Sequence, residues 1–195
     1  MTIETPRVSI IIITYNNEAF IEKCVQSAIE QTFDSKEVIV IDDGSTDSTR
    51  TMLEPYMDDI IYHYQDNSGI PKARNKGLDL AQAEFINPMD GDDFFLYTDK
   101  VKDQIDLLEQ HPNWGMVQGG FQLVDYDNHV FHYLHPWEQL PIEPTLHDVI
   151  SRLWFNLQSS LIRREWFDKV GRFDPSYQRA EDVDLIMRLV AQDMV

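Results

Sequence analysis

In the first half of the chain, short apolar runs alternate with stretches in which apolar residues recur every three or four positions. The run Val8–Thr14 shows no apolar–polar alternation, which is typical of a parallel strand buried on both faces. The three- and four-residue spacing is typical of amphipathic helices. The pattern therefore predicts a parallel α/β sheet with right-handed crossovers. The expected strands are Val8–Thr14, Val38–Ile41, Ile60–Tyr64 and Glu84–Met89, and the expected helices are Phe20–Ile29, Thr46–Tyr56 and Pro71–Ala81.

After Asp93 the alternation of strands and helices stops. A helix with Val101, Ile105 and Leu108 on its apolar side is expected to end before His111-Pro112. The other expected elements are a strand over Met116–Val124, an antiparallel partner over His129–Leu134, a proline-rich irregular stretch over 136–144, a strand over Leu157–Ile162, a helix over Glu165–Val170 and a last helix from Glu181. We find no repeat or linker and expect a single domain over residues 1–195.

Polar side chains gather at three of the predicted strand ends, in Thr14–Asn17, Asp42–Ser45 and Asp90–Asp93. In the first cluster, Asn16 or Asn17 is also expected to cap the following helix. Parallel strands end at one edge of a sheet, and ligands bind beyond that edge. The sequence therefore predicts one ligand site built from all three clusters.

The segment Asp90-Gly91-Asp92-Asp93 places three carboxylates around one glycine. Carboxylates this close raise one another's pKa unless a cation or hydrogen-bond donors hold them. Gly91 allows the backbone to turn so that the carboxylates converge. Hard divalent cations prefer such oxygen ligands. The segment therefore predicts a site for a metal-bound diphosphate, and the alternative is a solvated acidic turn.

Composition excludes several function classes. The chain has 34 acidic and 16 basic residues and a formal charge of −18, which argues against nucleic acid or an anionic membrane surface as a partner. Cys24 is the single cysteine, so no intrachain disulfide can form, and its place on an apolar helix face predicts burial. The N-terminus does not resemble a signal peptide. We expect a cytoplasmic protein with at most peripheral membrane association.

Five short motifs occur in a characteristic order: Ile12–Asn16, Asp42–Asp47, Gly69–Leu78, Asp90–Asp93 and Glu181-Asp182. In this order the chain resembles the family-2 inverting glycosyltransferases from about Val8 to Leu189. The resemblance implies the A-type glycosyltransferase fold, an α/β fold with a Rossmann-like, mostly parallel central sheet and helices on both faces. It implies a nucleotide-binding half over about 1–97 and an acceptor-binding half over about 98–195. Relatives usually continue beyond the last motif, so we expect the chain to be C-terminally truncated.

The resemblance also implies residue roles at the donor site. The ring of Tyr15 would lie against the base of the nucleotide, and Asp42 and Asp43 would accept hydrogen bonds from base and ribose. Arg74 would reach the diphosphate, because a guanidinium fork suits phosphate oxygens. The whole implied nucleotide-binding set is Thr14, Tyr15, Asn16, Asp42, Asp43, Arg74, Asp90, Gly91 and Asp92.

In the same way, the resemblance implies that Asp92 and Asp93, supported by Asp90, hold Mn²⁺ or Mg²⁺. It implies that Asp182 is the catalytic base, with Glu181 as second choice. An inverting displacement needs one carboxylate to remove the proton of the acceptor hydroxyl. The alternative for Glu181 and Asp182 is a pair of acids favoured by the dipole of a helix N-terminus.

The resemblance implies transfer of a sugar from a nucleotide-diphosphate sugar, of UDP type, to a saccharide, lipid-linked or protein acceptor. One alternative is a nucleotide-sugar-binding module or inactive partner subunit. Another is a sugar nucleotidylyltransferase, although no glycine-rich phosphate loop follows the first strand.

Two further patterns in the hairpin region carry a weaker metal signal. His129, His132 and His135 are spaced by three, which does not keep side chains on one face of a strand, so we expect no zinc site there. Asp125-x-Asp127 resembles the start of a calcium loop but lacks its glycine and closing glutamate, and we expect a turn.

Overall fold

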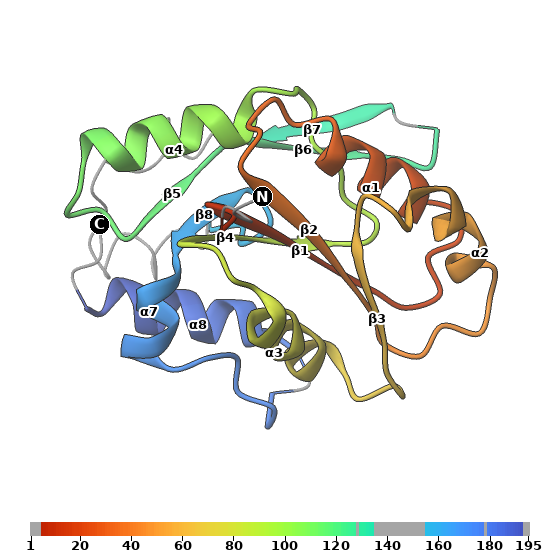
Figure 1. Cartoon of the computed structure of the whole chain (residues 1–195). Helices are drawn as coiled ribbons and strands as arrows, with labels where there is room; N and C mark the ends of the chain where they lie inside the picture. The colour runs from red at the N-terminus through yellow and green to blue at the C-terminus, as the bar shows by residue number, and fades with distance from the viewer. Residues whose placement is uncertain (1–4, 128, 135–154, 178, 193–195) are drawn as a thin grey trace.

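The computed structural model describes residues 5–127, 129–134, 155–177 and 179–192 (Figure 1). Strands and helices alternate through the first half as the apolar pattern predicts. The elements are β1 (Val8–Thr14), α1 (Ile21–Ile29), β2 (Lys36–Asp42), α2 (Thr49–Leu53), a 3₁₀ turn (Glu54–Tyr56), β3 (Ile61–Tyr64), α3 (Ile70–Leu80) and β4 (Phe85–Asp90). The main sheet has the strand order β3-β2-β1-β4-β8-β5. Its first four strands are parallel, and the antiparallel β8 (Ser160–Arg163) separates β4 from β5 (Met116–Gln118).

The strand register brings the predicted clusters to one edge of the sheet. Thr14 at the end of β1 pairs with Asp42 at the end of β2. On the other side of β1, Ile13 pairs with Asp90. The three polar segments therefore start side by side, as the strand ends predict.

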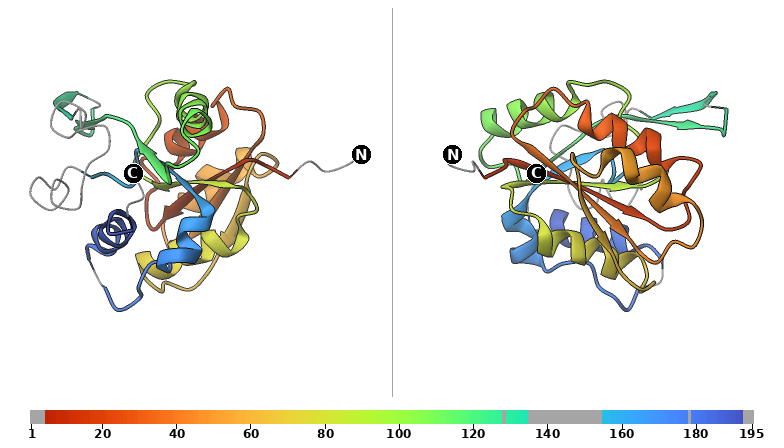
Figure 2. Two further views of the ribbon diagram at one scale, coloured as in Figure 1. Left: turned by 90° about the vertical axis from the view of Figure 1, so that its left-hand side faces the viewer. Right: turned by 45° about the vertical axis from the view of Figure 1, so that its right-hand side comes forward.

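Helices cover both sides of the sheet (Figure 2), and both faces of β1 are buried, which explains why β1 shows no apolar–polar alternation. Ile11 and Ile13 face one core together with α3, α7 (Arg164–Val170) and α8 (Glu181–Val190). Ile10 and Ile12 face a second core together with α1 and α4 (Lys100–Gln110). Cys24 of α1 is fully buried in this second core, as predicted.

The strand predicted over Met116–Val124 is two strands, because the chain leaves the main sheet at Gly119-Gly120, and its predicted antiparallel partner is confirmed. Gly119 still donates its backbone N–H to the carbonyl oxygen of Ser159, but among the described residues β6 (Phe121–Val124) pairs with β7 (Val130–Leu134) alone, in a separate antiparallel hairpin. The predicted strand over Leu157–Ile162 begins later, at Ser160.

The predicted asparagine cap of α1 is also wrong. The cap position is Phe20, where no side chain makes a capping hydrogen bond, and the backbone carbonyl of Asn17 accepts from Phe20 and Ile21 instead.

No helix within the described ranges has the length and apolar character needed to cross a membrane.

Gly77 marks the closest packing of α3 on the sheet. A Cβ atom at this position would overlap Cγ2 of Ile11, a β-branched side chain buried in β1. Gly77→Ala should therefore destabilise the protein, because overpacking costs about 1–3 kcal/mol and exceeds the gain of up to about 1 kcal/mol in helix propensity. The measurement is the urea midpoint of unfolding. Lys72→Ala, at an exposed position of α3, is the matched control, and a Gly77→Ala midpoint at or above that of the wild type would contradict the packing argument.

Candidate functional site

The candidate site lies at the sheet edge where β1, β2 and β4 end. Tyr15 is 49% exposed beside this edge, so its ring is accessible to a flat ligand. Thr14 is buried, and its hydroxyl oxygen has no hydrogen-bond partner among the described residues. A buried hydroxyl without a hydrogen-bond partner lowers stability unless a ligand or a water molecule supplies the hydrogen bond. Tyr15 and Thr14 therefore fit the predicted nucleotide site.

Asn16 joins two of the loops at this edge. Its backbone adopts the left-handed conformation, with φ of 52°. Its Oδ1 accepts from the backbone N–H of Thr46 at 2.8 Å, and its own N–H donates to Oγ of Ser45 at 2.9 Å. The side chain of Asn16 thus holds the loops after β1 and β2 together.

Asp42 and Asp43 have their carboxylates satisfied within the protein. Asp42 is fully buried, with Oδ1 accepting from the N–H of Ser45 at 2.8 Å and Oδ2 from the hydroxyl of Tyr62 at 2.7 Å. Asp43 is 5% exposed and accepts from the backbone N–H groups of Ser68 and Gly69. In this conformation both carboxylates shape the loops around the site.

Arg74 joins the acidic segment to the last helix. Its Nη2 donates to Oδ1 of Asp90 at 2.9 Å, and its Nη1 lies 3.1 Å from Oε1 of Glu181. The guanidinium group also lies over the ring of Phe173, 5.3 Å from its centroid. With only 4% of Arg74 exposed, this conformation places it between two carboxylates rather than in an open diphosphate site.

Gly91 is required by the close approach of β1 and the acidic turn. A Cβ atom there would lie 2.8 Å from Oγ1 of Thr14 and 3.0 Å from Nδ2 of Asn17. Asp90, just before it, uses both carboxylate oxygens, because Oδ2 accepts from Nε2 of Gln158 at 2.5 Å. The sequence pattern placed Gln158 only within the expected strand Leu157–Ile162 and did not predict this contact.

Asp92 and Asp93 are exposed to solvent, whereas Asp90 is only partly exposed. Asp93 keeps an exposed edge, yet desolvation by the surrounding protein, together with the charges of Asp90 and Asp92, raises its pKa to about 7. Desolvation also raises the pKa of Asp92, with a smaller contribution from Asp90. A divalent cation would relieve this repulsion, and the oxygen donors suit Mg²⁺ or Mn²⁺. The residues present therefore fit the predicted metal.

Glu181 and Asp182 occupy different environments at the start of α8. Glu181 is 5% exposed and contacts Arg74. Asp182 is partly exposed, and its Oδ1 accepts from the backbone N–H of Val183 at 2.8 Å. Since a base must reach substrate, Asp182 is the better placed of the two.

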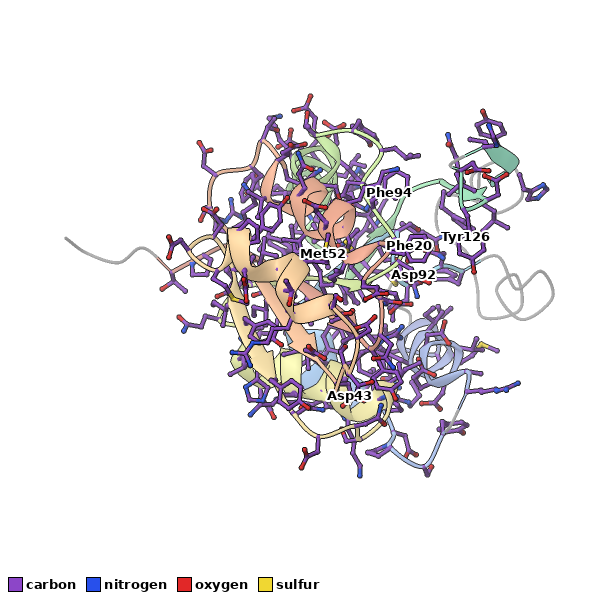
Figure 3. All side chains as sticks on the ribbon, turned by 90° about the vertical axis from the view of Figure 1, so that its right-hand side faces the viewer. Phe20, Asp43, Met52, Asp92, Phe94 and Tyr126 are labelled. Atoms are coloured by element: carbon purple, nitrogen blue, oxygen red, sulfur yellow. The ribbon has the colours of Figure 1, made fainter. Side chains whose placement is uncertain are left out.

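The β6–β7 hairpin holds a second group of metal-type ligands. Ligand atoms of Asp125, Asp127 and His129 lie within 4.8 Å of one another, and all three residues are exposed. Asp125 also accepts from the backbone N–H groups of Asp127 and His129, which forms the expected turn. Of the evenly spaced histidines, His135 lies outside the described residues. In Figure 3 Tyr126 of this hairpin lies beside Phe20, and their ring centroids are 5.6 Å apart.

Comparison with known proteins identifies the family of this chain. The model of the family described as glycosyl transferase family 2 matches residues 9–173. An uncharacterized glycosyltransferase of Rickettsia typhi is 34% identical over 189 residues, which cover 93% of this chain and 58% of that protein. The chain thus spans little more than half the length of this relative.

Solved structures show the same fold. The crystal structure of S. aureus TarS in complex with UDP-GlcNAc matches with a TM-score of 0.76 and 25% identity, over 94% of this chain and 53% of that chain. The mannosyltransferase PcManGT of Pyrobaculum calidifontis, in complex with GDP-Man and Mn²⁺, matches with a TM-score of 0.66 and 21% identity, over 94% and 52%.

Removing the charge of Arg74 should cost much more stability than removing a surface arginine. Arg74→Met leaves Asp90 and Glu181 without their shared counter-charge, and breaking a buried pair in this way costs about 3–5 kcal/mol. Arg172→Met is the control, because Arg172 pairs with Asp79 at the surface and such pairs contribute at most about 1 kcal/mol. Urea unfolding of both variants measures the difference, and equal losses would refute the linking role of Arg74.

Proposed function

The chain belongs to glycosyl transferase family 2, and on that basis we propose that it is an inverting, metal-dependent glycosyltransferase with a nucleotide-diphosphate sugar, of UDP type, as donor. The observation that carries the proposal is the link from Asp90 through Arg74 to Glu181. This link holds the first turn of α8, and with it the open carboxylate of Asp182, against the acidic turn at the end of β4.

The proposed donor site uses the exposed ring of Tyr15 to stack on the base. The unpartnered hydroxyl of Thr14 is available to the nucleotide beside Gly91. Asp42, Asp43 and Asn16 hold the loops that frame this site, and a direct contact from Asp43 to the ribose would require it to release Ser68 or Gly69. UDP-GlcNAc in the similar TarS structure supports a UDP-type donor.

Asp92 and Asp93 are the proposed ligands of Mn²⁺ or Mg²⁺, and Asp90 supports the turn through Arg74 and Gln158. A divalent cation bound there would neutralise charge on the leaving nucleoside diphosphate.

Asp182 is the proposed general base. Its carboxylate takes the proton of the acceptor hydroxyl as the acceptor oxygen bonds to the anomeric carbon and the bond from that carbon to the diphosphate oxygen breaks. Attack from the face opposite the leaving group inverts the configuration, so no second carboxylate is needed as nucleophile. Glu181 cannot share this role in the present conformation, because it is buried against Arg74.

The acceptor, a saccharide, a lipid-linked saccharide or a protein, is assigned to the second half of the chain, residues 98–195. A nucleotide-sugar-binding module without turnover is the alternative. The partly open Asp182 favours the enzyme, because a binding module needs no base at this position.

The first test concerns the metal. Asp92→Asn/Asp93→Asn should abolish the Mn²⁺ dependence of UDP binding, because the two open carboxylates are lost, and calorimetric titration of UDP with and without Mn²⁺ measures it. Asp125→Asn/Asp127→Asn is the matched control in the hairpin and should retain the dependence. If the hairpin variant lost the Mn²⁺ dependence and Asp92→Asn/Asp93→Asn kept it, the functional metal would lie in the hairpin.

The second test concerns the base. Asp182→Asn should lower the turnover rate by about 10²-fold or more, the scale of a general-base contribution, and keep UDP affinity. Release of UDP from UDP-GlcNAc in the presence of an acceptor measures turnover. Asp184→Asn removes a different charge from the same helix turn and should keep most of the activity. Full turnover in Asp182→Asn would remove Asp182 from the mechanism.

A further inference from the structure

A cavity of about 140 Å³ lies next to the acidic turn, on the α4 side of the sheet. Its apolar wall comes from the segment after β4 and from strand β6, and includes Phe94, Phe95 and Phe121. Asp92 and Asp93 line the cavity, and so does Lys100, the first residue of α4. The proposed donor site therefore adjoins a second space that contains both acidic and basic groups.

Lys100 is a buried cation without a carboxylate partner in the described part of the chain. It is 8% exposed, and its Nζ donates to Oε1 of Gln104 at 3.1 Å and lies 5.0 Å from the centroid of the Phe95 ring. An ammonium group has three donors, so this single acceptor leaves hydrogen-bonding capacity unused. Burial lowers its pKa to about 7, which reflects the cost of a charge held away from water.

Gln104 fixes the position of Lys100. Nε2 of Gln104 donates to the carbonyl oxygens of Ser159, at 2.9 Å, and Val117, at 3.3 Å. These contacts turn Oε1 toward Lys100, which is one of the residues that line the cavity. An apolar side chain would fill the same place without the cost of a buried charge. Packing alone therefore does not explain a lysine here.

We propose that this cavity is an acceptor subsite for an acidic group, a carboxylate or a phosphate ester, and that Lys100 supplies its counter-charge. The inference rests on the proposed glycosyltransferase function, since it is the adjoining donor site that makes the ligand an acceptor. Asp92 and Asp93 lie at the donor side of the cavity, where acceptor hydroxyls belong, and Lys100 holds the anionic end.

The volume limits the occupant to a small group. Water occupies roughly 30 Å³ per molecule, so 140 Å³ corresponds to about four or five waters. That space suits an oxyanion with the adjoining sugar or polyol carbons. The aromatic wall offers apolar contact to those carbons.

The test compares matched anionic and neutral probes: glucuronate against glucose, and glycerol 3-phosphate against glycerol. NMR spectra of protein labelled with ¹³C-lysine follow the ε-CH₂ signal of Lys100, which Lys100→Met identifies by its disappearance. One of the anions should shift this signal to saturation, and the neutral probes should not. Which anion does so separates a carboxylate subsite from a phosphate subsite.

Lys100→Met should weaken binding of that anion about tenfold or more, the scale of one lost charge-assisted contact. Calorimetry measures the affinity, and the variant should fold because it removes a buried charge. Lys102→Met, on the same helix but exposed and paired with Asp106, should bind as the wild type does. Equal binding of anionic and neutral probes, unchanged affinity in Lys100→Met, or no binding of either anion would each overturn the proposal.

Titration of the wild-type protein with UDP and Mn²⁺ separates this inference from the proposed function. If the protein binds an anion through Lys100 but does not bind UDP, the subsite is supported and the donor assignment is refuted. If the protein binds UDP but binds neither anion, the donor assignment is supported and the subsite is refuted.

Discussion

The structure of the site depends on one buried guanidinium group shared by two carboxylates. Arg74 comes from α3, Asp90 from the end of β4 and Glu181 from the start of α8, so one side chain connects three elements that are far apart in sequence. A buried charge is costly unless an opposite charge lies beside it, which favours the one arrangement that brings these three groups together. The proposed base, Asp182, is positioned because its neighbour in the helix is part of this arrangement.

The same interaction gives the three aspartates of the acidic turn different roles. Arg74 and Gln158 occupy both oxygens of Asp90, so this residue holds the turn in place. Asp92 and Asp93 have no such partner among the described residues, and desolvation raises the pKa of each. In a chain of formal charge −18, the two open carboxylates keep an unrelieved repulsion that a divalent cation would remove.

The two faces of the sheet contribute different parts of the site. The core that includes α3 and α8 carries Arg74 and the proposed base. The core that includes α1 and α4 lies beside the cavity that holds Lys100. The acidic turn lies where the two faces meet, at the carboxyl end of β4. In the proposed reaction, the acceptor hydroxyl would lie between the base and the anomeric carbon of the donor sugar.

The sequence by itself determined the parallel sheet and the position of the site, because unbroken apolar runs such as Val8–Thr14 specify strands buried on both faces and the polar clusters follow directly at their ends. The split of Met116–Val124 between two sheets depended on the pairing of Met116–Gln118 with β8, which is distant in sequence. Likewise, only the tertiary structure decided that Asp42 is fully buried and that Arg74 bridges Asp90 and Glu181. Pattern and spacing describe what one segment prefers, whereas the pairing of buried charges is set by which segments the fold brings together.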